Sequence, residues 1–377
     1  MQLFCVKPKV HNFPTFKDFT NEFKIKSTDV LLTEKLMYDL FAKDLNLICN
    51  VVLKDEYDTG EPKEETVDQI LKDIENMQTK RIIAMGGGSV IDIAKILMIK
   101  DAYPIERIMS KKVDFVTDKE LVIIPTTCGT GSEVTSGGIV TMKETGLKTA
   151  LIDERLTATH SILIPELIAG LPYKLFVYCS IDALAHAMES FVSATRGNEF
   201  ERAMGTRAIE IILDGYADII LNGKEYRKNI LNNFIQASCM AGMAVNNGGA
   251  GPVHALAYPI AEGYKMGHGE SIYQFLTPVF DMYLREKPSE VLDRLMDIIE
   301  KPLRKVGLFT DREHTFTQME VMLGMMHPID PLSKCGMEKE EIEPFAESII
   351  ETKQRLVEAS YVLFTKGKAI EIYKMRY

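Results

Sequence analysis

The first half of the chain alternates short apolar runs with amphipathic stretches, and this alternation limits the possible folds more than any other feature. Four runs of strand length, rich in Val and Ile, occupy residues 29–33, 45–53, 81–87 and 120–127. The segments between them, such as KLMYDLFAK and EETVDQILKDIENMQ, carry apolar residues at helical spacing. Because parallel strands need long connections, which are usually helices, this order predicts a parallel sheet with helices on both faces.

The character of the sequence changes after about Pro165. Before that point, two further strand-like runs, residues 137–142 and 148–153, are expected to extend or cover the sheet. After it, long helical patterns dominate. A chain of 377 residues exceeds the size at which one hydrophobic core usually stops growing. We therefore predict two domains, an α/β domain over residues 1–168 and an all-α domain over residues 169–377.

The overall composition argues against several classes of protein. A formal net charge of −10 disfavours nucleic acid or an anionic membrane as the main partner, because both require a basic face. No apolar run approaches the roughly 20 residues of a membrane span, and the first residues lack the apolar core of a signal peptide. The six Cys are scattered, without a CxxC pair. We expect reduced thiols in a cytoplasmic protein.

A strand, three glycines and a helix follow one another without a spacer in RIIAMGGGSVIDIAK, residues 81–95. Gly86, Gly87 and Gly88 allow a tight turn and a close approach of the backbone to a ligand. The helix that follows directs free N–H groups and its positive dipole end to the same place, which suits a pyrophosphate. The loop matches neither the P-loop nor GxGxxG, and a glycine-rich turn is often only a turn.

A second loop of the same design follows the next strand, in IIPTTCGTGSEVT. Gly129 and Gly131 again free the backbone. The hydroxyl groups of the loop belong to Thr126, Thr127, Thr130 and Ser132. Two such loops at the carboxyl ends of neighbouring strands would form the crevice in which doubly wound sheets bind nucleotides. Cys128 has no basic neighbour in sequence, so we expect a packed thiol rather than a nucleophile.

Four potential metal ligands occur in two pairs in the second half of the chain. Asp182 and His186 are four residues apart in SIDALAHAMES, which places both on one face of a helix. His254 and His268 lie in apolar or glycine-rich settings, in GPVHALAYPI and GHGESI. A single such histidine is more often a hydrogen-bonded core residue. Four together, on a chain with a phosphate-cradling loop, indicate a divalent metal site that suits Fe(II) or Zn(II).

The chain resembles the iron-containing, group III alcohol dehydrogenases from about Asp29 to the C-terminus, in GGGSVIDIAK, PTTCGTGSEVT and the spacing of these four ligand candidates. The resemblance implies a dehydroquinate synthase-like architecture, with a Rossmann-like nucleotide-binding domain, an α-helical metal-binding domain and an active site in the cleft between them. It implies NAD(H) and one divalent metal as cofactors, with Fe(II) first and Zn(II) as the alternative. The implied metal ligands are Asp182, His186, His254 and His268.

The same resemblance implies contacts to the cofactor. The implied pyrophosphate loop and lining residues are Gly86, Gly87, Gly88, Ser89, Thr126, Thr127, Thr130 and Ser132. Lys148 matches a lysine that relatives place near the ribose or phosphate, and a solvated loop lysine is the alternative. Glu34 follows a strand-like run where NAD-preferring relatives commonly carry Asp. A carboxylate there accepts hydrogen bonds from ribose hydroxyls and repels a 2′-phosphate, which predicts NAD over NADP. A Glu favoured by the dipole at a helix start is the alternative.

Two further residues lie near the ligand candidates in the sequence. Tyr258 stands where many relatives have a histidine with a proton-relay role near the nicotinamide. Its ordinary pKa near 10 makes tyrosine a poorer base at neutral pH, and a packing role is the alternative. Lys265 lies beside His268 and is the basic residue that sequence alone places near the metal. It is expected to bind a substrate carboxylate, with a solvent-facing loop lysine as the alternative.

The resemblance implies that a primary alcohol and its aldehyde are interconverted with NAD. Its most similar stretches, which include EPKEET and GMEKEEIEPFAESIIE, imply 4-hydroxybutyrate and succinic semialdehyde as the pair. The alternatives are a general primary-alcohol dehydrogenase, a lyase of the dehydroquinate synthase type and a non-catalytic nucleotide- or metal-binding protein. The expected partners are a small hydroxy acid or aldehyde substrate and a second copy of the chain in a homodimer, with neither nucleic acid nor membrane.

Overall fold

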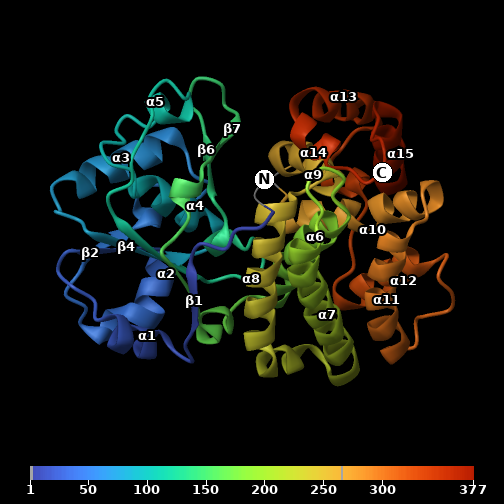
Figure 1. Ribbon diagram of the computed structural model, residues 1–377, viewed down its shortest axis with the longest axis horizontal. Coiled ribbons are helices and arrows are strands. Elements are labelled where there is room, and N and C mark those ends of the chain that lie inside the picture. Colours follow the sequence, from blue (N-terminus) through green and yellow to red (C-terminus); the bar gives the residue numbers. More distant parts are fainter. Residues whose placement is uncertain (1–2, 265) are drawn as a thin grey trace. The chain divides into compact units, whose positions relative to one another are not determined.

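The computed structural model describes residues 3–264 and 266–377. This part of the chain forms two compact units (Figure 1). The α/β unit contains Val6–Thr127 and Gly131–Gly170. The helical unit contains the described residues up to Cys5, Cys128–Thr130 and Leu171–Tyr377. The predicted fold class, a parallel-sheet domain followed by an all-α domain, is confirmed.

Two short segments that fall within the first predicted domain pack with the helical unit. Cys5 N donates to Asn247 Oδ1 over 2.7 Å, and Asn247 Nδ2 donates to Cys5 O over 3.1 Å. Gly129 lies so close to Cys179 that a Cβ on the glycine would sit 2.8 Å from the Cys179 carbonyl oxygen. The division between the units therefore differs from residues 168 and 169, because these backbone contacts leave no trace in hydrophobic periodicity.

The main sheet of the α/β unit has six strands, and every pairing between them in the described residues is parallel. In spatial order the strands are β1 (Lys9–Asn12), β8 (His160–Leu163), β5 (Glu120–Pro125), β4 (Arg81–Gly86), β2 (Asp29–Thr33) and β3 (Asn50–Leu53). The helices of the unit are α1 (Phe16–Phe23), α2 (Lys35–Met37), α3 (Glu64–Glu75), α4 (Gly88–Leu97) and α5 (Glu106–Met109). Short helical turns are η1 (Tyr38–Ala42), η2 (Lys43–Leu45), η3 (Lys54–Glu56), η4 (Ser132–Val134), η5 (Glu154–Leu156) and η6 (Pro165–Ile168).

Successive residues of the central strands point into two different cores. Val30 and Leu32 belong to a core that includes residues of α3 and α4. Leu31, between them, belongs to a second core with Phe16 and Phe19 of α1. Because both faces of the sheet are covered, the strands read as continuous apolar runs rather than as alternating patterns. This burial is why the sequence pattern located the central strands.

The structure differs from the sequence prediction in several places. Only residues 50–53 of the run 45–53 form a strand, and neither β1 nor β8 was predicted. Residues 137–142 and 148–153 give β6 (Gly137–Thr141) and β7 (Lys148–Ile152), an antiparallel pair separate from the main sheet. This pair packs on α4, so it covers the unit and does not extend the sheet. Short strands such as β1 and β8 escape prediction because tertiary pairing, not local periodicity, makes them strands.

The helical unit is built on three long helices that pack against one another, α6, α7 and α8 (Figure 1). Its helices are α6 (Tyr173–Val192), α7 (Glu199–Asn222), α8 (Leu231–Gly248), α9 (Pro252–Gly263), α10 (His268–Glu286), α11 (Glu290–Lys305), α12 (Thr315–Met326), α13 (Ile342–Thr352), α14 (Gln354–Glu358) and α15 (Lys366–Arg376). Short turns are η7 (Lys224–Asn229), η8 (Leu332–Cys335) and η9 (Lys339–Glu341). The helical pattern over residues 340–364 is divided at Lys353 into α13 and α14.

Helix α6 is apolar along most of its length and forms the centre of the unit. By length and composition it could cross a membrane, but 89% of its most apolar window is buried inside the protein. It is therefore a core helix, and its few polar side chains lie among buried neighbours. Buried polar groups require partners that satisfy them. Asp182, His186 and Glu189 are three such groups on α6.

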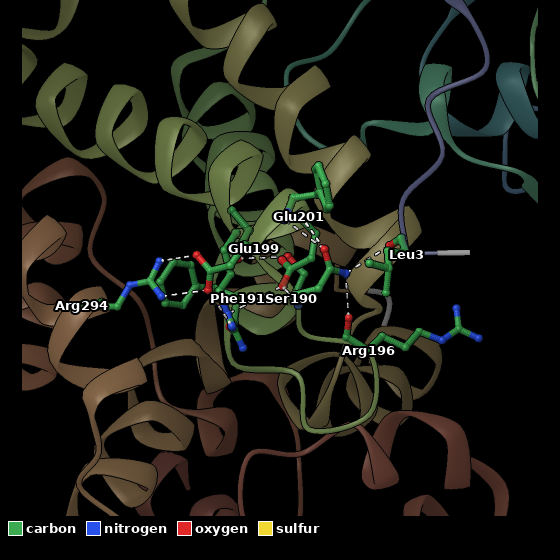
Figure 2. Close-up of polar contacts among 11 residues, drawn as sticks. Leu3, Ser190, Phe191, Arg196, Glu199, Glu201 and Arg294 are labelled. Carbon is green, nitrogen blue, oxygen red and sulfur yellow. Dashed lines mark hydrogen bonds and ion pairs between the residues drawn. The ribbon is translucent and has the colours of Figure 1, made fainter. Parts of the chain in front are cut away.

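Helix α7 begins at a capping box that Figure 2 shows in detail. The Asn198 side chain accepts hydrogen bonds from the backbone N–H groups of Phe200 and Glu201, and Glu201 Oε1 accepts one from Asn198 N over 2.9 Å. Both nitrogens of the Arg294 fork donate to Glu199 over 2.9 Å. Glu201 itself has no exposed surface, and burial raises its pKa to about 7.

Candidate metal centre

Three imidazole nitrogens of the helical unit face one carboxylate oxygen. Asp182 and His186 lie one turn apart on α6, His254 lies in the first turn of α9, and His268 is the first residue of α10. The Nε2 atoms of His254 and His268 are each 3.6 Å from Asp182 Oδ1. His186 Nε2 lies 3.9 Å from the same oxygen. The structure therefore brings together all four residues that the sequence pointed to as ligands.

The donor atoms fit a divalent cation. Asp182 Oδ1 and His254 Nε2 are buried, and neither has a hydrogen-bond partner among the described residues. One ligand atom from each of Asp182, His254 and His268 lies within 4.8 Å of the other two. His186 falls outside this tight set, but its ring stacks on that of His254 at 4.5 Å between centroids. A buried, unpaired carboxylate oxygen is costly, and a cation among these nitrogen and oxygen donors would remove that cost.

Ionisation of these side chains is consistent with metal binding. Burial opposes the charge on Asp182, but the three nearby histidines hold the pKa of its carboxyl below the ordinary value. Burial lowers the pKa of His186 to about 4, which keeps its imidazole neutral. Burial also opposes a charge on His254, but Glu189 and Asp182 together raise its pKa to about 9. A bound divalent ion would displace the His254 proton, since a metal ligand must be deprotonated.

A fifth residue, Glu189, supports the site without facing its centre. Glu189 Oε2 lies 2.5 Å from His254 Nδ1, and Glu189 Oε1 accepts a hydrogen bond from Val253 N over 2.6 Å. With Nδ1 occupied, His254 directs Nε2 toward Asp182, as in the carboxylate–histidine–metal arrangement. The sequence analysis missed Glu189. Its spacing from Asp182 and His186, seven and three residues further along α6, places all three on one helix face and could have revealed it.

The glycine-rich loop of the α/β unit has the predicted strand–turn–helix form. Strand β4 ends at Gly86, Gly87 is the N-cap, and α4 begins at Gly88, followed by Ser89 in its first turn. A Cβ on Gly86 would lie 2.5 Å from the Val90 side chain, so the close packing of β4 and α4 requires glycine there. The free N–H groups at the start of α4 can then receive a phosphate group.

The second loop lies beside the first. Thr126 N donates to Gly86 O over 3.1 Å, and a Cβ on Gly87 would contact Thr127 at 3.7 Å. The carboxyl ends of β4 and β5 thus carry both loops at one place in the α/β unit. Thr130 belongs to the short segment that packs with the helical unit.

The Ser132 hydroxyl contacts two charged side chains of α4, Asp92 and Lys95. It donates to Asp92 over 3.2 Å and accepts from Lys95 Nζ over 3.1 Å. Lys95 also donates to Thr135 Oγ1 and to Gly137 O. These contacts tie α4 to η4 and β6, and the role of Ser132 in lining the cofactor site stays a prediction. Sequence reasoning did not identify Asp92 or Lys95.

Two family models match the chain, that of the iron-containing alcohol dehydrogenase over residues 14–165 and that of the C-terminal domain of the Fe-containing alcohol dehydrogenase family over residues 176–377. The chain belongs to the iron-containing alcohol dehydrogenase family. It is 39% identical to 4-hydroxybutyrate dehydrogenase of Clostridium kluyveri over the full length of both chains. It is 28% identical to alcohol dehydrogenase 4 of Saccharomyces cerevisiae, over 92% of this chain and 87% of that one.

Solved structures of the same fold include 1,3-propanediol oxidoreductase, with a TM-score of 0.83 at 22% identity and full coverage of both chains. Sulfoacetaldehyde reductase from Bifidobacterium kashiwanohense, solved in complex with NAD+, has a TM-score of 0.84 at 17% identity, over all of this chain and 99% of that one. At these identities the likeness establishes the fold alone. The family resemblance expected from the sequence motifs is confirmed.

The remaining residues that the family resemblance singled out have defined places. Glu34 directly follows β2, next to the strand that leads into the glycine loop, and forms no hydrogen bond as a helix cap. Lys148 Nζ is 2.7 Å from Glu61 Oε2, so its charge is engaged by a carboxylate of the same unit. Cys128 is buried, which raises the pKa of its thiol to about 12 and leaves it a poor nucleophile.

Tyr258 and Lys265 were the two catalytic candidates. Tyr258 lies on α9, one turn after His254, with its ring centroid 6.4 Å from that of His268. Lys353 Nζ lies 4.2 Å from the centre of the same tyrosine ring. Lys265 lies outside the described residues. The role of Lys265 stays a prediction, and the sequence analysis did not single out Lys353.

Proposed function

We propose that this protein is an NAD-dependent, metal-dependent dehydrogenase that interconverts 4-hydroxybutyrate and succinic semialdehyde. The observation that carries the dehydrogenase proposal is the set of histidine nitrogens around the buried, unpaired Asp182 oxygen. The substrate proposal is supported by 39% identity, along the whole of both chains, to a protein named 4-hydroxybutyrate dehydrogenase. Membership in the iron-containing family supports Fe(II), with Zn(II) compatible with the same donors.

Each part of the chain then has a distinct task. The bound metal would supply Lewis-acid polarisation of the substrate oxygen, and NAD would supply the hydride acceptor. Asp182 contributes negative charge to the site, and Glu189 holds His254 in one orientation. Gly86 and the start of α4 receive the pyrophosphate, and Glu34 favours NAD by repelling the 2′-phosphate of NADP.

The proposal also covers the location and the oligomeric state of the enzyme. We place it in the cytoplasm, which is supported by six cysteines that are all free thiols. We also propose a homodimer, the assembly expected from the sequence. Gel filtration combined with light scattering would test the homodimer.

One assay tests the central proposal. The protein is loaded with Fe(II) or Zn(II) and mixed with NADH and succinic semialdehyde, while NADH absorbance is followed. We expect metal-dependent loss of NADH, faster than with NADPH, and a higher kcat/KM for succinic semialdehyde than for butanal, which has the same chain length without the charge. Equal rates with butanal would indicate a general alcohol dehydrogenase. Absence of any net NADH consumption would contradict the dehydrogenase proposal and favour the lyase or a non-catalytic protein.

A further inference from the structure

A substrate with a carboxylate at the end remote from the alcohol needs a cation in the pocket, because an unpaired buried carboxylate is costly. We propose that Lys353, held against the ring of Tyr258, binds this carboxylate and so selects an acidic substrate. The proposal rests on the proposed function, which supplies the substrate class. It makes Lys353 a specificity-determining residue and Tyr258 the platform that positions it.

The geometry connects Lys353 to the metal-ligand set through a single side chain. Lys353 lies at the junction of α13 and α14, which both pack against α9. Its Nζ is 4.2 Å from the centre of the Tyr258 ring, within the range of a cation–π contact. The Tyr258 ring is in turn 6.4 Å from the ring of His268, centre to centre. All these residues belong to the helical unit.

The charge of Lys353 is available for a ligand. The Lys353 ammonium group contacts the Tyr258 ring. Within residues 3–264 and 266–377 no carboxylate forms an ion pair with it. Lys174 is a second cation near the site, but its Nζ lies 3.2 Å from Glu270 Oε1. This ion pair compensates the charge of Lys174. Glu270 also accepts a hydrogen bond from Tyr178, which holds its carboxylate in place. Of these two lysines, only Lys353 offers an uncompensated charge.

The separation suits a short substrate. The distance from the His268 ring centre to Lys353 Nζ cannot exceed the sum of the two separations that meet at Tyr258. An extended four-carbon hydroxy acid spans roughly 5 Å from its alcohol oxygen to its carboxyl carbon, by standard bond lengths. Hydrogen bonds at the two ends of the substrate, together with the flexible lysine side chain, account for the rest of the distance between His268 and Lys353 Nζ. A tyrosine face also attracts an ammonium group, whereas a protonated histidine at this position would repel it.

The test compares two substrates in matched variants. We expect Lys353→Met to raise KM for succinic semialdehyde roughly 10- to 100-fold, the range for loss of one charge-assisted hydrogen bond, with little change in kcat. KM for butanal should stay as in the unaltered enzyme, which also shows that the variant is folded. Lys353→Arg should restore most of the preference. Lys366→Met removes a partly exposed lysine that pairs with Glu347 and should change KM for neither substrate.

Two variants of Tyr258 distinguish a role in positioning Lys353 from a role in proton transfer. Tyr258→Phe keeps the aromatic face and should keep both the preference and kcat, whereas Tyr258→Leu should lose the preference. The Kd of 4-hydroxybutyrate, measured by calorimetry on the metal-loaded protein, should rise in parallel with KM in Lys353→Met. If the unaltered enzyme prefers succinic semialdehyde and Lys353→Met keeps that preference, the role of Lys353 is overturned and the proposed substrate stands. If the unaltered enzyme shows no preference, the proposed substrate falls, and the role of Lys353 falls with it.

Discussion

Glu189 and His254 are joined by a hydrogen bond of 2.5 Å between Oε2 and Nδ1, although they lie on different helices, α6 and α9. The second oxygen of Glu189 accepts the N–H of Val253. One carboxylate therefore fixes both the orientation of the histidine ring and the start of the helix that carries it. This arrangement leaves His254 Nε2 directed toward Asp182, where a metal would need it.

The first prediction follows from this pair. His254 Nδ1 and Val253 N face different oxygens of Glu189, and in Glu189→Gln one of these oxygens becomes an NH2 donor, so one of the two contacts is lost. We expect a 10- to 100-fold loss of metal affinity, the usual effect of removing such a supporting carboxylate. Competition with a chelator of known affinity measures it without reference to activity. Glu347→Gln, an exposed change of the same kind on α13, is the control. Unchanged affinity in Glu189→Gln would remove the supporting role.

The second prediction concerns a ligand itself. His268 is the most exposed of the four, with 39% of its side chain accessible, so its loss should disturb packing little. We expect His268→Ala to lose most of its bound metal and nearly all activity while keeping the circular dichroism and thermal midpoint of the apo protein. Metal content is measured by elemental analysis after gel filtration. His314→Ala removes an exposed histidine that pairs with Asp311 and serves as the comparison. A fully metallated and active His268→Ala would rule out the assignment.

The third prediction concerns the glycine turn. A Cβ on Gly86 would meet the Val90 side chain at 2.5 Å, so Gly86→Ala must push α4 away from β4. We expect a loss of about 1–3 kcal/mol in the free energy of unfolding, as for other overpacked sites, and weaker NADH binding in calorimetry. Gly170→Ala is the matched control, because a Cβ there meets nothing within 4 Å. If Gly86→Ala resembles Gly170→Ala in both measurements, the turn does not require glycine.

The fourth prediction concerns pH and uses Glu201, which lies in the first turn of α7 and is not among the metal-ligand candidates (Figure 2). Burial raises its pKa from 4.5 to about 7 in the folded protein. Between these two values the folded state binds more protons than the unfolded state, so this residue lowers stability as pH rises from about 4.5 to about 7. The contribution is on the order of 3 kcal/mol.

Glu201→Gln tests that sign. The amide keeps the acceptor for Asn198 N and cannot ionise, so the variant should gain stability relative to the unaltered protein at pH 7.5 and not at pH 4.5, by about 3 kcal/mol at most. Urea unfolding at both pH values gives the two differences. Glu199 is exposed, and Arg294 lowers its pKa to about 2. Glu199→Gln should therefore lose stability, and not gain it, relative to the unaltered protein at pH 7.5. Identical pH dependence of the unaltered protein and Glu201→Gln would contradict the prediction.

Much of this protein could be predicted from local sequence. Strand β2 and the starts of β4 and β5 coincide with the apolar runs, because strands buried on both faces need continuous apolar side chains. The spacing of Asp182 and His186 placed both on one helix face, since the period of a helix is a local property. The glycine turn was readable for the same reason: backbone sterics near Gly86 act over a few residues.

Tertiary structure alone decided the rest. Strands β1 and β8 come from opposite ends of the α/β unit and pair with each other, and β8 also pairs with β5. The Ser132 hydroxyl bonds to Asp92 and Lys95, two contacts that no sequence pattern predicted. Lys353 is separated by a long stretch of chain from the Tyr258 ring that it contacts. Local periodicity carries no record of such contacts, because they depend on which distant segments the packing of the core brings together.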